Sequence, residues 1–503
     1  MAFGHRTRAA AALLALGATA ALVYWGNGLM PWWPLMWFAP LPVLWFALRR
    51  PAWQAALVAA AAWMLGGLNL WDYLVRVLGA PPIAWFLDIG GAAAAFALGV
   101  LITRALARRG AVWAAWLALP AVWVSFEFGR NLLWSNGSAA SIAYSQLNCL
   151  PFLQTASLAG PWGMAFVLML FPTGLALGGA AWRGNRAQAW RVLGATLGVV
   201  AALLIFGALR LASPQPGPRV KVGLIASDAN GGAQVQPPGA ATATLLRTYA
   251  GQARRLIAQG ARVVVMPEHL GAVRDGGVAA TNAIFQPIAD QTGAVLVVGV
   301  ARRRPNVARN QARIYAPRVP VRTYAKEHLL DPYETERFAP GRTRAMLPPP
   351  GGGRGRWGVA ICKDLDFTNP ARAYGRAGVG LLLAPAWDFS VDRFWHGHIA
   401  VMRAVEDGFG LARAARRGDL TVADDRGRIL AERRSSAAPF TTLLADVPTG
   451  HQWTPFLWLG DWWGWVSMAL LALLVARLVT LRTGADAAPS GLPEKTSRAP
   501  ITR

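Results

Sequence analysis

Cysteine is almost absent from this 503-residue chain, which contains only Cys149 and Cys362. Because Cys149 is the only other cysteine, we do not expect Cys362 to be present for a disulfide. Charge is scarce as well, since charged residues make up 15% of the chain and hydrophobic residues 54%. This balance is too apolar for an ordinary soluble enzyme.

Several motifs of common enzymes are also missing. The sequence has no Gly-x-Ser-x-Gly elbow and no His-Glu-x-x-His, which argues against an α/β serine hydrolase and the usual zinc protease. His396-Gly397-His398 is the nearest approach to a metal-binding pair, but no third ligand is obvious, so we expect two ordinary histidines on a helix surface. The Gly-x-Gly-x-x-Gly pattern within 353–358 precedes an expected strand, whereas a dinucleotide site requires it to follow one.

The apolar residues are concentrated at the two ends of the chain, in 9–212 and from about 456 to 481. A membrane-spanning helix needs roughly 20 apolar residues. The sequence predicts eight such spans, near 9–25, 31–48, 53–75, 82–104, 111–128, 162–182, 190–211 and 460–481. The second of these contains prolines.

Acidic residues number 25 against 50 basic ones, a formal charge of +25, but the positions of the arginines do not indicate a nucleic-acid partner. Many of them lie at the ends of apolar segments, as the positive-inside rule expects. If eight spans alternate, one side of the membrane receives five clusters: Arg6 and Arg8; Arg49 and Arg50; Arg104, Arg108 and Arg109; Arg183, Arg186 and Arg191; Arg477 and Arg482. That side is expected to be the cytoplasm. The seventh span then exits outward, which predicts that residues 219–446 lie outside the cytoplasm, in the periplasm of a bacterium with two membranes.

The composition divides the chain into five parts. We expect a transmembrane domain at 1–212, a linker at 213–218, a globular domain at 219–446, a C-terminal transmembrane helix at 456–482 and a disordered cytoplasmic tail at 483–503. An alternative for the first segment is a signal peptide, because Ala18-Thr19-Ala20 is similar to a cleavage site. Cleavage there would leave the orientation of the later spans unchanged.

The globular part alternates apolar runs with helix-length stretches. Strands are expected at 220–225, 263–266, 295–300, 358–361 and 380–383, and helices at 241–259, 281–292, 369–378 and 392–407. This alternation predicts an α/β fold with helices on both faces of the sheet structure.

Three polar residues stand at or near the ends of strand-like runs. Cys362 follows an apolar run, Glu268 closes another, and Lys326 lies in Tyr-Ala-Lys-Glu-His-Leu. A glutamate can take the thiol proton as the sulfur attacks a carbonyl, and a lysine ammonium can stabilise the oxyanion. Glu334 can orient that lysine, and the amide of Lys363 offers a second oxyanion donor. Taken alone, Cys362 would more simply be a small core residue and Glu268 a loop residue.

The segments Met266-Pro267-Glu268, 324–330 and 361–364 resemble the three signatures of the nitrilase, or carbon–nitrogen hydrolase, superfamily. Over nearly its whole length the chain resembles the membrane-embedded branch of that superfamily, the apolipoprotein N-acyltransferases. Segments 123–130, 143–163 and 402–408 also match that branch. The resemblance implies about eight transmembrane helices and an extracytoplasmic α-β-β-α sandwich at the bacterial cell membrane.

The resemblance also implies the roles of individual residues. By position, Glu268 is the base, Lys326 the oxyanion support, Cys362 the nucleophile and Glu334 the additional glutamate. The implied reaction moves a fatty acyl chain from a phospholipid, through a cysteine thioester, to the N-terminal amine of a lipid-modified apolipoprotein. No metal or other cofactor is implied.

The sequence departs from the family pattern around the expected substrate pocket. Lys363-Asp364 follows the cysteine where the family usually has Tyr-Glu, and Ala384-Pro385-Ala386-Trp387 replaces Asn-Asp-x-Trp. Trp387 is thereby marked as a candidate substrate-binding residue. These departures leave two alternatives open: a membrane-tethered amidase or nitrilase, in which water resolves the thioester, and a non-catalytic binding protein. Cys149 has no assigned role beyond that of a small buried residue.

Overall fold

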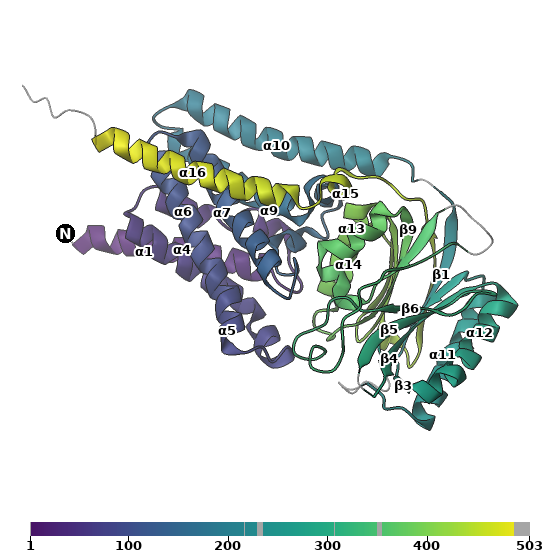
Figure 1. Ribbon diagram of the computed structural model, residues 1–503. Coiled ribbons are helices and arrows are strands. Elements are labelled where there is room, and N and C mark those ends of the chain that lie inside the picture. The colour runs from purple at the N-terminus through teal and green to yellow at the C-terminus, as the bar shows by residue number, and fades with distance from the viewer. Residues whose placement is uncertain (1, 216, 229–234, 306, 350–354, 487–503) are drawn as a thin grey trace, which may run out of the picture.

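The computed structural model describes all residues except 1, 216, 229–234, 306, 350–354 and 487–503. It shows a helical bundle beside an α/β sandwich (Figure 1). The long helix α10 (Arg186–Ala212) runs along the bundle and leads into the first strand of the sandwich. The chain returns to the bundle after the sandwich through the C-terminal helix α16 (Trp462–Asp486).

Seven helices in the described part of the chain are long and apolar enough to cross a membrane. They are built from α1 (Ala2–Gly26), α4 (Ala52–Gly67), α6 (Gly91–Arg108), α7 (Val112–Leu133), α9 (Ala156–Ala181), α10 and α16. Each matches one of the expected spans. Shorter elements extend the bundle at the sandwich end: η1 (Leu68–Leu70), η2 (Tyr73–Val77), α5 (Pro82–Trp85), η3 (Phe86–Gly90), η4 (Ile142–Gln146) and α8 (Leu150–Leu153).

The expected span at 31–48 is not among the seven, so the count of eight is not confirmed. Its residues form two short helices, α2 (Trp33–Met36) and α3 (Leu41–Ala47), because Pro34, Pro40 and Pro42 cannot continue one regular helix. The segment still joins the two ends of the bundle. The Trp33 carbonyl accepts a hydrogen bond from Gln146 near the sandwich, and the carbonyls of Ala47 and Arg50 accept from Arg104 at the far end.

The surface of the bundle is apolar. Large hydrophobic side chains of the spans remain exposed, among them Leu14, Leu57, Trp190, Ile205 and Leu473. Helices α10 and α16 are the least covered of the seven, because only 17% of the apolar stretch of each is buried by the rest of the protein. A soluble monomer rarely exposes so much contiguous apolar surface, whereas a bilayer covers it. The chain is therefore a membrane protein with several spanning helices.

At the C-terminus, α15 (Pro455–Leu459) precedes α16, and the two are separated by Gly460, whose φ of +65° interrupts the helix. Helix α16 continues to Asp486, so the expectation that the tail starts at 483 is wrong for its first four residues. The remainder of the expected tail lies outside the described residues.

Two sheets form the sandwich. In the first, the strand order is β13-β1-β2-β4-β5-β6, with β3 paired to β4; its strands are β1 (Arg219–Ala226), β2 (Val263–Val265), β3 (Ala272–Arg274), β4 (Val295–Arg303), β5 (Ala308–Tyr315), β6 (Arg322–Ala325) and β13 (Thr441–Pro448). In the second, the order is β12-β11-β10-β9-β8-β7; its strands are β7 (Ala345–Leu347), β8 (Arg356–Val359), β9 (Val379–Trp387), β10 (Gly410–Arg416), β11 (Asp419–Ala423) and β12 (Ile429–Arg434). The two sheets pack face to face through a core of aliphatic side chains together with Tyr324 and Trp357.

Helices cover both outer faces of this pair of sheets. Helices α11 (Ala240–Ala258) and α12 (Val278–Thr292) cover the first sheet on the side away from the bundle, and α13 (Thr368–Arg376) and α14 (Arg393–Asp407) lie between the second sheet and the bundle (Figure 1). The result is the α-β-β-α sandwich that the family resemblance implies, with helices on both faces as the sequence pattern predicts. All five expected strands and all four expected helices are present, with ends that differ by a few residues.

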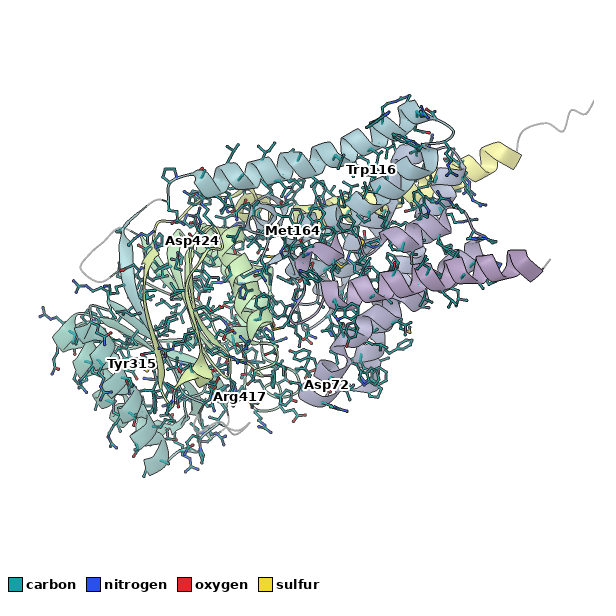
Figure 2. All side chains as sticks on the ribbon, turned by 180° about the vertical axis from the view of Figure 1, so that it is seen from behind. Asp72, Trp116, Met164, Tyr315, Arg417 and Asp424 are labelled. Atoms are coloured by element: carbon teal, nitrogen blue, oxygen red, sulfur yellow. The ribbon has the colours of Figure 1, made fainter. Side chains whose placement is uncertain are left out.

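The bundle and the sandwich are joined by polar contacts. Figure 2 shows Asp72 on the bundle side and Arg417 on the sandwich side of the boundary. Arg403 on α14 is fully buried and donates to the Tyr144 hydroxyl of the bundle at 2.8 Å and to Glu406 at 2.9 Å. The loop between α7 and η4 (134–141) contacts the turn that begins at Cys362, which places part of the membrane domain next to the expected nucleophile.

Candidate active site

The three residues expected to carry the chemistry follow the carboxyl ends of three strands. Glu268 lies after β2, Lys326 directly after β6, and Cys362 shortly after β8. The Glu268 amide donates to the Ala386 carbonyl on β9 at 3.3 Å, so the two sheets approach each other here. Gly299 on β4 permits the turn before Glu268, because a Cβ at that position would meet the Pro267 carbonyl oxygen at 2.2 Å.

Lys326 is held by two carboxylates. Its Nζ lies 2.8 Å from Glu268 Oε1 and 2.7 Å from Glu334 Oε2. All three side chains are buried. Burial alone would lower the pKa of Lys326, but Glu268 and Glu334 outweigh it and raise that pKa well above its ordinary value. Lys326 is therefore an ammonium ion at neutral pH.

The Cys362 thiol sits in a strained turn beside this group. Cys362 has φ of +44°, a conformation that costs a residue with a Cβ about 1–3 kcal/mol, and it begins the 3₁₀ turn η6 (Cys362–Asp366). Its Sγ lies 3.5 Å from the Trp387 carbonyl oxygen. Burial raises the pKa of the Cys362 thiol well above its ordinary value and Glu268 raises it further, whereas Lys326 opposes the rise. The resting residue is a neutral thiol, which needs a base to become a nucleophile.

Asp364 fixes this turn, although sequence analysis gave it no role. Its carboxylate is fully buried and accepts four hydrogen bonds. Two come from the Ile361 amide at 2.9 Å and the Tyr324 hydroxyl at 2.7 Å, and two from the amides of Glu327 and His328 at 3.0 and 2.8 Å. It thus ties the Cys362 turn to the segment that carries Lys326. Its sequence signal was its place in the segment 361–364, where it stands in the position of the family's usual glutamate.

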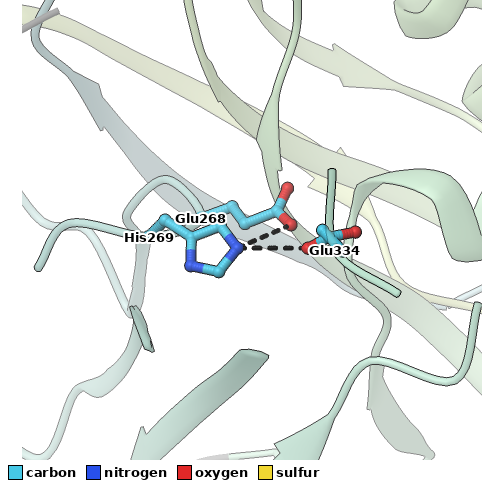
Figure 3. A group of neighbouring side chains, drawn as sticks. All are labelled: Glu268, His269 and Glu334. Atoms are coloured by element: carbon cyan, nitrogen blue, oxygen red, sulfur yellow. Dashed lines mark hydrogen bonds and ion pairs between the residues drawn. The ribbon is translucent and has the colours of Figure 1, made fainter. Parts of the chain in front are cut away.

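Glu334 and Glu268 share further donors that sequence reasoning also missed. Asn310 on β5 donates through Nδ2 to Glu268 Oε1 and, at 2.7 Å, to Glu334 Oε1. His269 Nε2 lies 3.1 Å from Glu334 Oε1 and 3.7 Å from Glu268 Oε1 (Figure 3). Burial alone would raise the pKa of Glu334, but Lys326 and His269 lower it well below its ordinary value. A polar residue inside a strand, such as Asn310, carries no sequence signal of its own.

Ligand atoms of Glu268, His269 and Glu334 lie within 4.8 Å of one another, a spacing compatible with a metal ion. The same carboxylate oxygens already accept from Lys326 and Asn310. A divalent cation would have to displace the Lys326 ammonium, since both need these oxygens. We therefore assign the group to an ion-pair network around Lys326.

A cavity of about 600 Å³ connects this network with the bundle. Its sandwich side is lined by Glu268, Lys326, Glu334, Cys362 and Trp387, so all the residues singled out from the sequence face one space. Its bundle side is lined by apolar side chains from four helices or their extensions, including Val23, Trp63, Leu70, Leu74, Trp123 and Phe126. Trp387 is half-buried at the end of β9, with the Arg416 guanidinium 4.1 Å from the centre of its ring.

The expectation for His396 and His398 is wrong, because neither lies on an open helix surface. Two residues apart on α14, they point in different directions. His396 lines the cavity and bridges Asp366 at 3.3 Å and Asp392 at 3.2 Å, and His398 is buried with Nδ1 2.9 Å from the Phe394 carbonyl oxygen. Burial alone would lower the pKa of His396, but the two carboxylates raise it to about 10.

The Asp364 contacts lead to a prediction. In Asp364→Asn, the new side-chain NH₂ group would face N–H and O–H groups that now donate to the carboxylate, so at least one of those hydrogen bonds is lost. We therefore expect a loss of about 1–3 kcal/mol in the free energy of unfolding and a lower rate of Cys362 acylation. Thermal unfolding in detergent and mass spectrometry of the acylated protein measure the two effects. Asp446→Asn, at an exposed position on β13, is the matched control. Wild-type behaviour of Asp364→Asn would show that the carboxylate does not hold the turn.

Comparisons with known proteins agree with this architecture. Residues 10–174 match the family model described as apolipoprotein N-acyltransferase N-terminal domain, and residues 233–450 match that of the carbon–nitrogen hydrolases. The chain is similar to the apolipoprotein N-acyltransferase of Geobacter metallireducens, with 26% identity over 88% of this chain and 90% of the relative. It is also 26% identical to that of Gloeobacter violaceus, over 95% of this chain and 96% of the relative.

Among solved structures, an amidase of the nitrilase superfamily from Nesterenkonia is 24% identical and superposes with a TM-score of 0.39, covering 47% of this chain and 94% of the amidase. The two family models match the bundle and the sandwich separately, and the two relatives extend across both parts. The chain therefore combines a segment that matches the apolipoprotein N-acyltransferase N-terminal domain with a carbon–nitrogen hydrolase domain, and it is similar to apolipoprotein N-acyltransferases over most of its length.

Proposed function

We propose that this protein transfers a fatty acyl chain from a phospholipid to the N-terminal amine of a diacylglyceryl-cysteine lipoprotein. The observation that carries the proposal is the cavity that joins Cys362 to apolar side chains of the membrane helices. A long acyl chain can lie against Trp63, Trp123 and Phe126 while its ester reaches the thiol. A small amide would make no use of that apolar half, which argues for transfer between lipids over hydrolysis of soluble amides.

In the first step, Glu268 takes the Cys362 proton as the sulfur attacks the ester carbonyl. The Lys326 ammonium and the Lys363 amide stabilise the oxyanion. The carbon–oxygen bond to glycerol then breaks, Glu268 returns the proton to the leaving oxygen, and lysophospholipid departs. A thioester remains on Cys362.

In the second step, the α-amine of the lipoprotein attacks the thioester. Glu268 takes a proton from the amine, the carbon–sulfur bond breaks as the amide forms, and Glu268 returns the proton to the sulfur and so restores the thiol. Glu334 and Asn310 keep Lys326 and Glu268 in position throughout, since both contact the Glu268–Lys326 pair. Both substrates are anchored in the bilayer, which accounts for the attachment of the sandwich to a membrane domain.

The transfer proposal predicts the products of a defined assay. Purified protein with phospholipid and a diacylated lipopeptide should yield triacylated lipopeptide, and Cys362→Ala should lower the rate by at least about 10³-fold because no thioester can form. Mass spectrometry measures both the amide product and the acyl adduct. Cys149→Ala is the control. Release of free fatty acid without amide would indicate a hydrolase, and the absence of any adduct on Cys362 would indicate a non-catalytic protein.

The proposed role of Glu268 leads to a prediction about both the acylation rate and the pKa of the Cys362 thiol. Glu268→Gln should slow acylation severely, yet it should lower the pKa of the Cys362 thiol, because a negative charge that raises that pKa is removed. The alkylation of Cys362 by iodoacetamide across a pH series, in a Cys149→Ser background, gives the midpoint of thiol ionisation. A midpoint that stays unchanged or moves to higher pH would contradict the proposed charge arrangement.

We propose further that the protein lies in the bacterial inner membrane with its sandwich outside the cytoplasm. Arginines gather at the end of the bundle away from the sandwich: Arg104 bonds the Arg50 carbonyl there, and Arg49 and Arg183 are electrostatic neighbours. Under the positive-inside rule, this end faces the cytoplasm. The broken segment α2–α3 joins the two ends of the bundle, which keeps the alternation of spans consistent with this orientation.

Thiol labelling tests the orientation. In a chain with Cys149→Ser and Cys362→Ala, Glu336→Cys adds a thiol at an exposed site of the sandwich, and Gly184→Cys adds one at the opposite end of the bundle. A membrane-impermeant maleimide applied to intact spheroplasts should modify the Glu336→Cys protein alone. Labelling of the Gly184→Cys protein alone would reverse the assignment.

A further inference from the structure

Lys363 places a buried positive charge beside the expected nucleophile. The residue is 5% exposed, and it follows Cys362 directly and lines the same cavity. Its Nζ donates to Asn136 Oδ1 at 2.9 Å, whereas the nearest carboxylate oxygen, on Asp366, lies 3.8 Å away and beyond hydrogen-bond distance. An ammonium has three donors. Among the described residues, Lys363 therefore meets one acceptor within hydrogen-bond reach and retains donors for a ligand.

The other cations around the cavity are less suited to bind an anion at this point. Lys326 is held by Glu268 and Glu334, and Arg130 pairs with Asp88 at 3.1 Å. Arg76 pairs with Asp72 and is largely exposed. Arg337 is exposed as well, and Arg417 is only part-buried, with its Nε 3.4 Å from the Ser390 hydroxyl. Among the cavity-lining cations that the structure describes, Lys363 combines burial, spare donors and immediate proximity to the thiol.

The charges around Lys363 leave room for an added negative group. Asp366 is the closest carboxylate, and His396 bridges it to Asp392. With His396 protonated, two carboxylates face two cations in this cluster. An anion bound at Lys363 would therefore not enter a strongly negative field, because His396 offsets Asp366.

The position of Lys363 fits the geometry of a glycerophospholipid. Lys363 and Cys362 are consecutive residues whose side chains line the same cavity, so the lysine side chain lies near the Cys362 sulfur. In a glycerophospholipid, the acyl ester and the phosphate are attached to the same glycerol unit. An ester carbonyl at the thiol therefore brings the phosphodiester within the reach of the neighbouring lysine, a residue type that binds phosphate as a point charge.

We propose that Lys363 binds the phosphodiester group of the acyl donor and so selects phospholipids over uncharged acylglycerols. This inference rests on the proposed function, because it assigns one part of the donor to one residue of the same site. Lys363 binds the donor in this role and takes no part in the transfer of protons. Asn136, from the loop of the membrane domain, holds the ammonium when no donor is present.

A competition experiment separates this role from a purely structural one. The full-length protein in detergent is acylated at Cys362 by a p-nitrophenyl fatty ester, which carries no phosphate and releases p-nitrophenol. Two non-transferable ether lipids compete with it: a dialkyl phosphatidylglycerol and a dialkylglycerol with the same chains. The wild type should be inhibited more strongly by the phosphate-bearing lipid.

Lys363→Gln should weaken inhibition by the ether phospholipid about tenfold and leave inhibition by the dialkylglycerol unchanged, and Lys363→Arg should restore most of the difference. Asn136→Asp should weaken it similarly, because a carboxylate 2.9 Å from Nζ would occupy the lysine without removing it. Lys221→Gln on β1, away from the cavity, is the matched control. The p-nitrophenol burst shows whether each variant retains a folded active site.

Three results would overturn the proposal: a wild type that does not distinguish the two lipids, equal weakening toward both in Lys363→Gln, or no weakening in Lys363→Gln and Asn136→Asp. Failure of the proposed function looks different. It would leave the lipopeptide without an amide in the transfer assay, while the competition between ether lipids still reports on Lys363.

Discussion

The site depends on one buried ammonium bound by two carboxylates. Lys326, Glu268 and Glu334 are each less than a tenth exposed, and any of these charges would be costly to bury alone. Together they are stable because each meets the others at hydrogen-bond distance and because Asn310, His269 and the Leu330 amide donate to the carboxylates. Burial and the Glu268 carboxylate raise the pKa of the neighbouring Cys362 thiol, and Lys326 only partly opposes them, so the thiol keeps its proton at rest.

This arrangement explains the use of a two-sheet sandwich. The carboxyl ends of β2, β6 and β8 come from both sheets, and they meet only where the sheets converge. The bundle then supplies what the sandwich lacks, an apolar wall for long acyl chains. The sandwich side of the cavity carries the charged residues around Cys362, and its bundle side is mainly tryptophan, phenylalanine and aliphatic side chains, with Arg130 and Asp88 among them; this lining suits the polar and apolar halves of a phospholipid.

The sequence predicted those parts of the fold whose residues are uniformly apolar. Strands β2 and β9 are almost wholly buried, and β1, β4 and β8 each contain a buried apolar run, whereas β5 and β12 carry arginine, asparagine or glutamate and gave no comparable signal. The segment 31–48 was apolar enough to be taken for a span, but its prolines divide it. Length and hydropathy detect an apolar segment, but they do not determine whether it forms one continuous helix.

The candidate site was predictable for Glu268, Lys326 and Cys362, which follow strands in recognisable signatures, and for Glu334, which matches a family position. Asp364, Asn310 and His269 were not, because their roles arise from contacts between segments far apart in the chain. His396 was misplaced for the same reason, since Asp366 and Asp392 approach it only in the folded protein. Local sequence does not reveal which buried charges will meet.

The loop between α7 and η4 forms hydrogen bonds with the turn that contains Cys362. The Ser138 amide and hydroxyl both donate to the Asp366 carbonyl, and a Cβ at Gly137 would meet the same oxygen at 2.7 Å. The strained backbone at Cys362 is thus stabilised partly by residues of the membrane domain. A sandwich expressed without the helices would lose these contacts as well as its membrane anchor, so this chain cannot be converted into a water-soluble catalyst by excision alone.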